Sequence, residues 1–210
     1  MASNNEEGKI ALASEDATPT NDIDPSLVTT GSPVEGGCVY TSFKANPTLP
    51  TDAATKISTL ADLVSLGDLS SDGFTASKSV TVNEFKGWHQ SIVLTKVSEE
   101  KHQYKMVFIE SVRSSVAKLR YGAGNVETNT DGTFSHIKVI ANSDVRVPLV
   151  IDELEDTGNL RRTVIPRVSI DSYDDVEHKP GGLVQYGFTF TVIKTAGKPL
   201  FDIYRAKPAA

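Results

Sequence analysis

Hydrophobic and polar residues alternate along most of the chain from residue 38 onward. Between Tyr186 and Val192, Tyr186, Phe188, Phe190 and Val192 occupy every second position, with glycine and threonine between them. Successive side chains of a strand point to opposite faces, so this pattern predicts a strand with one buried and one wet face. The same alternation in residues 145–151 predicts a second such strand, with Asp152 on the wet side.

Further strands are predicted where apolar or β-branched runs end at turn residues. They cover residues 38–44, 74–83, 90–97, 102–109, 134–140, 164–170 and 200–205. Asp72-Gly73 and Asp131-Gly132 are typical of the turns between them. Pro148 and Pro166 indicate edge strands or bulges, because proline cannot donate to a strand ladder. The predicted fold is mostly β, an antiparallel β-sandwich or barrel with one flanking α-helix.

The pattern changes to a helical period in two places. Val112, Val116 and Leu119 are spaced as on one helix face, and we expect Ser111 to cap this helix and Gly122 to end it. Apolar residues in helical spacing between Thr51 and Val64 predict a second helix after a proline.

The first 36 residues differ from the rest of the chain. They are rich in Asn, Asp, Glu, Ser, Thr, Pro and Gly and show no sustained periodicity. Such a segment buries too little apolar surface to offset its ordering entropy. We therefore divide the chain into an extended N-terminal arm (1–36), a β domain (37–205) and a C-terminal tail (206–210), and expect a neighbouring subunit to hold the arm.

Charge argues against a protein that binds nucleic acid tightly. Lys and Arg total 21 against 27 Asp and Glu, the net charge is −6, and no long basic run occurs. The single cysteine, Cys38, lies in an apolar run and is expected to be a buried small hydrophobe. We find neither a membrane span nor an N-terminal leader, and expect synthesis and retention in the cytoplasm unless an assembly carries the protein out.

Motifs for catalysis, metal binding or cofactor binding are missing from the sequence. The four histidines are scattered, and no ligand spacing joins them. Acidic residues cluster at 171–178, but without the alternating ligands and central glycine of a calcium loop, so we interpret this segment as a solvated loop. We therefore expect no enzyme activity, no cofactor and no metal.

One ordered series of short motifs resembles a known family. The run Leu66-Gly67-Asp68-Leu69-Ser70-Ser71-Asp72-Gly73, a Ser/Thr-rich strand and Gly87-Trp88-His89-Gln90 follow one another, and Glu110 then introduces a helix ending in Tyr121-Gly122. This order is similar to that of siphophage major tail tube proteins, over roughly residues 37–205. The segments 162–168 and 186–192 resemble the family's final sheet.

The resemblance implies an assembly and its partners. It implies hexameric rings whose inner sheets form a continuous β-barrel and stack into a tube that conducts DNA during ejection. A tape measure protein would fill the lumen before ejection, and tail tip and tail terminator proteins would bind the two ends. The protein would be part of the virion tail, made and assembled in the host cytoplasm.

Candidate lumen and contact residues follow from this assembly. Small polar side chains share one face of the 74–83 strand, and a barrel closed by several copies would turn that face to a wet channel; they are Thr75, Ser77, Ser79, Thr81 and Asn83. Trp88 either packs in the core or contacts another subunit. Phe85, Ile23 and Val28 are the other candidate inter-subunit contacts.

Two other functions fit the same fold. One is the tube subunit of a contractile injection or secretion system, for which the signature at 66–75 would not be expected. The other is a carbohydrate-binding β-sandwich module, which usually displays exposed aromatic residues. Here Trp88 and six tyrosines are available, and most of the tyrosines occupy alternating positions typical of a core.

Overall fold

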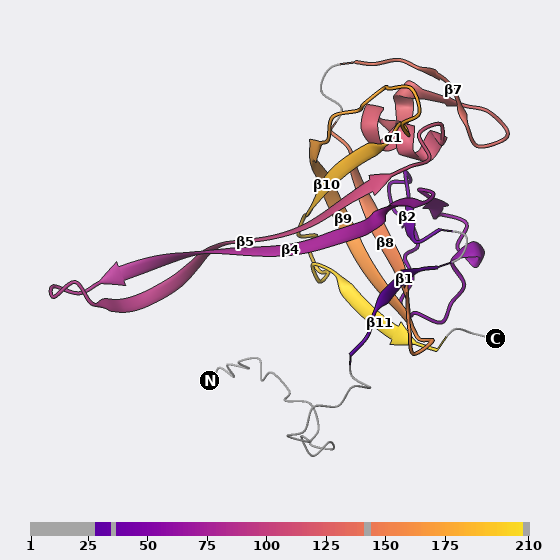
Figure 1. The fold of residues 1–210 in the computed structure, drawn as a ribbon. Coiled ribbons are helices and arrows are strands. Elements are labelled where there is room, and N and C mark those ends of the chain that lie inside the picture. The colour runs from indigo at the N-terminus through magenta and orange to yellow at the C-terminus, as the bar shows by residue number, and fades with distance from the viewer. Residues whose placement is uncertain (1–27, 35–36, 141–143, 208–210) are drawn as a thin grey trace, which may run out of the picture.

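The computed structural model describes residues 28–34, 37–140 and 144–207. Antiparallel pairing joins nine of its strands into one sheet in the order β3-β2-β8-β9-β10-β5-β4, with β1 also beside β8 and β11 beside β9 (Figure 1). These strands are β1 (Gly31–Pro33), β2 (Val39–Thr41), β3 (Val64–Ser65), β4 (Leu69–Lys86), β5 (Ile92–Phe108), β8 (Arg146–Glu155), β9 (Leu160–Tyr173), β10 (Tyr186–Val192) and β11 (Asp202–Ala206).

A smaller unit lies at one end of the large sheet. It contains the helix α1 (Ser114–Tyr121) and a two-stranded sheet of β6 (Val126–Thr128) and β7 (Phe134–Ile137). Short 3₁₀ turns occur at Ile57–Thr59 and Ala123–Asn125. The small sheet lies beside α1 in the view of Figure 1.

Both halves of the large sheet contribute to one hydrophobic core. Phe108 and Phe188 come from β5 and β10, Leu149 and Ile165 come from β8 and β9, and all four are fully buried in the same cluster. On α1, Val116 and Leu119 join this cluster. The mostly β, antiparallel fold with one α-helix is confirmed, whereas the described residues contain no closed barrel.

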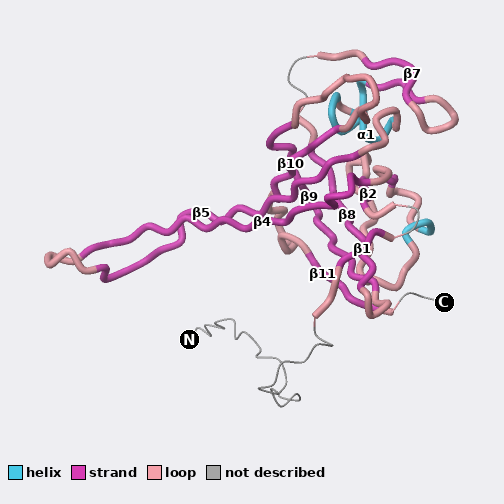
Figure 2. The backbone as a smooth tube through the Cα atoms, in the orientation of Figure 1, coloured by secondary structure: helices cyan, strands magenta, loops and turns pink. Residues whose placement is uncertain are grey.

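A long hairpin of β4 and β5 extends far out of the body, as Figure 2 shows. The expected strands at 90–97 and 102–109 merge into the single strand β5, which starts at Ile92, ends at Phe108 and pairs with β4. The turn expected at Asp72-Gly73 is instead a bulge inside β4, because Leu69 and Phe74 pair with Phe108 and Met106. Because β4 and β5 pair with each other along their length, neither strand is divided where the sequence suggested a break.

Pro148 of β8 and Pro166 of β9 lie at a bulge, which is one of the two expected alternatives. Val147 pairs with Val168 and Leu149 pairs with Ile165, so β9 has one more residue than β8 in this interval. Pro148 and Pro166 occupy the interval, where regular ladder hydrogen bonds are interrupted.

The expected helix starts two residues later than predicted. It begins at Ser114 with Arg113 at the N-cap position and no side-chain cap, so the assignment of Ser111 as cap was wrong. Arg113 is held extended by a bridge to Thr133 and an ion pair with Glu110. The end was predicted correctly, since Gly122 follows the last turn with φ 89°, a value that favours glycine.

The second expected helix, between Thr51 and Val64, does not form. Asp52 accepts hydrogen bonds from the amide and hydroxyl of Thr55, and the guanidinium of Arg162 binds the backbone carbonyls of both residues at 3.0 and 2.8 Å. These side chains thus bond to backbone groups that would otherwise form helix hydrogen bonds, and the segment forms a turn instead of a helix.

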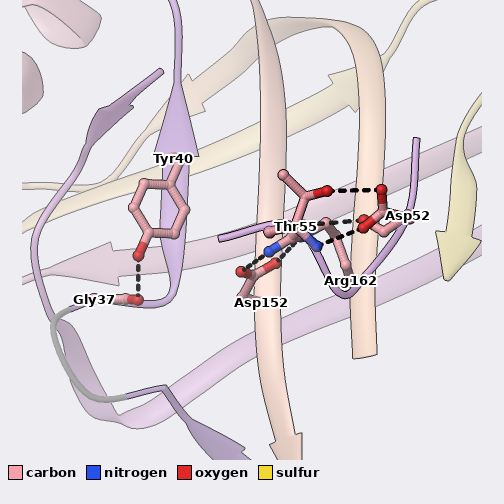
Figure 3. Close-up of polar contacts among 6 residues, drawn as sticks. All are labelled: Gly37, Tyr40, Asp52, Thr55, Asp152 and Arg162. Carbon is pink, nitrogen blue, oxygen red and sulfur yellow. Dashed lines mark hydrogen bonds and ion pairs between the residues drawn. The ribbon is translucent and has the colours of Figure 1, made fainter. Parts of the chain in front are cut away.

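Arg162 and Asp152 form a buried ion pair between neighbouring strands (Figure 3). Two guanidinium nitrogens of Arg162 donate to the two carboxylate oxygens of Asp152 at 2.7 and 2.8 Å, and the two residues are only 1% and 3% exposed. The prediction of Asp152 on a wet face was therefore wrong, because the 51–56 loop covers this face of β8 and β9.

Cys38 is buried as predicted, with 4% of its surface exposed. Burial, and next the negative charge of Asp68, raise the pKa of its thiol to about 11. The thiolate is the reactive form, and its population falls about tenfold per pKa unit. We expect alkylation of the folded protein by iodoacetamide at neutral pH to be at least about 100-fold slower than alkylation in urea, measured by mass spectrometry. Equal rates would contradict the buried position.

Candidate functional site: a polar sheet face and a projecting hairpin

One face of the β4–β5 pair carries small hydroxyl groups opposite amide and ammonium groups. In the antiparallel register, Thr75 pairs with Lys105, Ser77 with Gln103 and Ser79 with Lys101. Directly paired residues point to the same side of a sheet, so these six side chains share one face. The opposite face carries the buried Tyr104 and Met106 and therefore belongs to the core.

The polar face continues without interruption across the next two strands. Lys105 and Gln103 of β5 pair with Thr189 and Thr191 of β10, which in turn pair with Ser172 and Ser169 of β9. The Gln103 amide donates to the Thr191 hydroxyl at 3.3 Å. We call this surface of β4, β5, β10 and β9 the polar sheet face; its members are Thr75, Ser77, Ser79, Lys101, Gln103, Lys105, Ser169, Ser172, Thr189 and Thr191.

Two aspartates at the end of β9 contact the lysines of this face. Lys101 Nζ lies 2.8 Å from Asp171 Oδ2, which also accepts from the Gln103 amide at 3.0 Å. Lys105 Nζ lies 3.1 Å from Asp174 Oδ2. Asp174 packs over Gly187, where the Cβ of any other residue would collide with the carboxylate.

Sequence reasoning missed these ion pairs. It interpreted 171–178 as a solvated loop, whereas Asp171 belongs to β9 and Asp174 directly follows it. Asp171 lies at a register shift between the pairs Thr189–Ser172 and Phe190–Ile170, and no local pattern predicts this shift. The strand alternation of Lys101, Gln103 and Lys105 was the only signal that could have indicated these partners.

Beyond the body, the hairpin has only two strands and many exposed apolar side chains. We call residues 78–102 the projecting hairpin, because β10 pairs with β5 only from Gln103 onward. Its exposed large apolar residues are Val80, Val82, Phe85, Trp88, Ile92, Val93, Leu94 and Val97. A two-stranded ribbon is marginally stable alone in water, and clustered exposed apolar residues often mark an interaction site.

The predicted site residues fall on different parts of this surface. Thr75, Ser77 and Ser79 belong to the polar sheet face, of which Ser79 already lies at the base of the projecting hairpin, and Thr81 and Asn83 continue the same side further out. The alternation along β4 puts all five on the same side of the strand, and all five are exposed in the single chain.

The predicted contact residues are also exposed where they are described. Trp88 lies in the hairpin turn with 95% of its surface exposed, which excludes a core position in this chain, and Phe85 is 49% exposed. Val28 is 68% exposed, and Ile23 lies outside the described residues. Within the expected arm, β1 pairs with β8 of the same chain.

No group of three or more potential metal-ligating side chains gathers in residues 28–34, 37–140 and 144–207. In the same ranges, no helix has the length and apolar character needed to cross a membrane.

The polar sheet face and the apolar projecting hairpin are typical of a structural subunit that assembles through its strands. Comparison with protein families agrees: residues 35–209 match the family model described as phage tail tube protein. The chain belongs to this family, which implies a structural role in a phage tail through self-assembly into a tube. No curated protein matches the sequence.

Proposed function

We propose that this protein is the major tail tube protein of a siphophage. Six copies form a ring, the rings stack into the tail tube, and DNA passes through the lumen into the host during ejection. The observation that carries the proposal is the polar sheet face, which extends over four neighbouring strands while the opposite face is buried in the core. Such a sheet suits the wall of a wet channel.

Free strand edges support closure of the ring. In the described chain, β4 has β5 as its one partner, so its outer edge carries unpaired backbone groups. On the other side of the polar sheet face, β8 pairs with β9 only up to Ser169, which leaves the far edge of residues 170–173 without a described strand. Pairing of β4 with this segment of the next copy would join the sheets into a β-barrel and remove both edges.

The projecting hairpin supports contacts between copies. Phe85 and Trp88 are large, exposed and remote from the core, and burial of apolar surface contributes about 25 cal/mol per Å². We propose that both residues pack on a neighbouring subunit, with Val28 and Ile23 of the N-terminal arm as further contacts.

The remaining partners follow from the position in a tail. We propose that a tape measure protein fills the lumen before ejection, that tail tip and terminator proteins bind the two ends, and that assembly takes place in the host cytoplasm. DNA touches the lumen only transiently, in agreement with the net charge of −6.

Cysteine labelling tests which face lines the lumen. Ser77→Cys introduces a thiol on the polar sheet face, and the buried Cys38 gives little background. We expect a bulky polyethylene glycol maleimide to modify Ser77→Cys in free subunits and much less in tubes that electron microscopy shows to be assembled. The control is Thr130→Cys in the exposed turn between β6 and β7, away from this face.

Electron microscopy and labelling give separate outcomes. Tails that contain the protein in stacked rings of six, without a contractile sheath, would support the siphophage assignment. A protein that is missing from purified tail tubes would overturn it. Equal modification of Ser77→Cys in free subunits and in tubes would leave the tube role intact but refute the lumen position of the polar sheet face.

A further inference from the structure

The polar sheet face carries positive charges that its own chain neutralises. Lys101 and Lys105 are the lysines of this face between β4 and β10. Asp171 of β9 and Asp174, just after β9, contact them at 2.8 and 3.1 Å. Further along the sheet, Arg146 pairs in register with Ser169 and contacts Asp144 at 2.7 Å. Carboxylates thus accompany three basic residues on this side of the sheet, two on β5 and one on β8.

Stability alone does not account for these ion pairs. The side chains are between about one third and two thirds exposed, and exposed ion pairs contribute little to folding because water and salt screen them. By contrast, an unpaired lysine on a surface that faces DNA attracts phosphate groups and displaces counterions. Such an ion pair contributes little to folding. It does neutralise the lysine charge that a passing polyanion would otherwise meet.

We propose that Asp171 and Asp174 are charge-neutralising residues of the lumen, which keep Lys101 and Lys105 from binding the phosphates of DNA in transit. This inference rests on the proposed function. Asp171 is held in position by a second hydrogen bond, from the Gln103 amide. Asp174 is held by close packing on Gly187 and by its own amide, which donates to the Gly187 carbonyl at 3.0 Å.

Repetition in the assembly makes a small change large. Loss of one carboxylate leaves one lysine charge unpaired in each subunit, and every subunit of every ring repeats this change. Affinity for DNA falls steeply with salt in proportion to the number of phosphates that a protein contacts. Retarded passage caused by these lysines is therefore expected to depend strongly on ionic strength.

The test measures DNA ejection from intact virions that carry Asp171→Asn together with Asp174→Asn. Asparagine keeps the size and one acceptor oxygen but removes the charge. We expect ejection on the order of tenfold slower than in the original virion at low salt, and close to the original rate at high salt. Asp156→Asn is the control for one such substitution, because it removes one carboxylate charge in the exposed turn between β8 and β9; it should eject at the original rate.

Rescue separates neutralisation from a structural effect. Adding Lys101→Gln and Lys105→Gln to the two asparagines restores neutrality without restoring the ion pairs, and should restore the ejection rate at low salt. Slow ejection that persists in this variant, or an unchanged rate in the first variant at both salt concentrations, would overturn the proposal.

Further variants and outcomes separate an assembly defect, a wrong lumen assignment and a wrong neutralisation proposal. If the double asparagine variant does not assemble, Asp174→Asn alone, beyond the end of β9, gives the same test with a smaller expected delay. If Ser77→Cys is freely modified in assembled tubes, the lumen assignment itself fails. If Ser77→Cys is protected and ejection is unchanged, only the neutralisation proposal fails.

Discussion

Replacing Arg162 with methionine is expected to lower the free energy of unfolding by about 3–5 kcal/mol, because the change leaves the Asp152 carboxylate buried without its partner. The ion pair has two hydrogen bonds of 2.7 and 2.8 Å between residues that are almost completely buried. Arg162 also binds the carbonyls of Asp52 and Thr55, so the 51–56 loop loses its attachment to the sheet. Urea unfolding of the purified subunit, followed by circular dichroism, measures the change.

The neighbouring residue provides the control. Arg161 lies on the same strand with 46% of its side chain exposed, 4.0 Å from Glu153, and Arg161→Met should change stability by no more than about 0.5 kcal/mol. Combining Arg162→Met with Asp152→Leu removes the unpaired charge and should recover part of the loss. A loss below about 1 kcal/mol for Arg162→Met would contradict the assigned role of the pair.

Replacing Phe85 and Trp88 with serine is expected to abolish tube assembly at ordinary protein concentrations while the subunit stays folded. If both aromatic residues are central contacts between copies, each contributes about 2 kcal/mol or more, and together they raise the concentration needed for assembly on the order of a thousandfold. Sedimentation and negative-stain electron microscopy over a range of concentrations measure this threshold.

Folding and surface controls accompany this variant. Its unfolding midpoint should match that of the unchanged subunit, because neither side chain belongs to the hydrophobic core. Val112→Ser removes an apolar side chain that is 60% exposed on the body and should shift the threshold much less. Tubes that form at the original concentration from the Phe85→Ser, Trp88→Ser subunit would exclude the hairpin turn as a contact.

The sequence by itself determined the features that depend on local periodicity. Alternation along β4 put Thr75, Ser77 and Ser79 on one side and Phe74, Ala76 and Val80 on the other, and the register with β5 confirms the shared face of the three hydroxyl residues. Gly122 ended the helix as expected, because the positive φ at that position is a local requirement. The order of short motifs indicated the family that the match over residues 35–209 shows.

Tertiary structure decided which residues are buried and which charged side chains pair across the sheet. Local periodicity predicted a helix after Thr51 and a wet position for Asp152, but Arg162 from a distant part of the chain takes the carbonyls of the loop and buries the carboxylate. Likewise, only pairing through β10 brings Asp171 within reach of Lys101. The physical reason is that strand periodicity fixes which side a residue faces, whereas burial and charge pairing depend on segments that packing alone brings together.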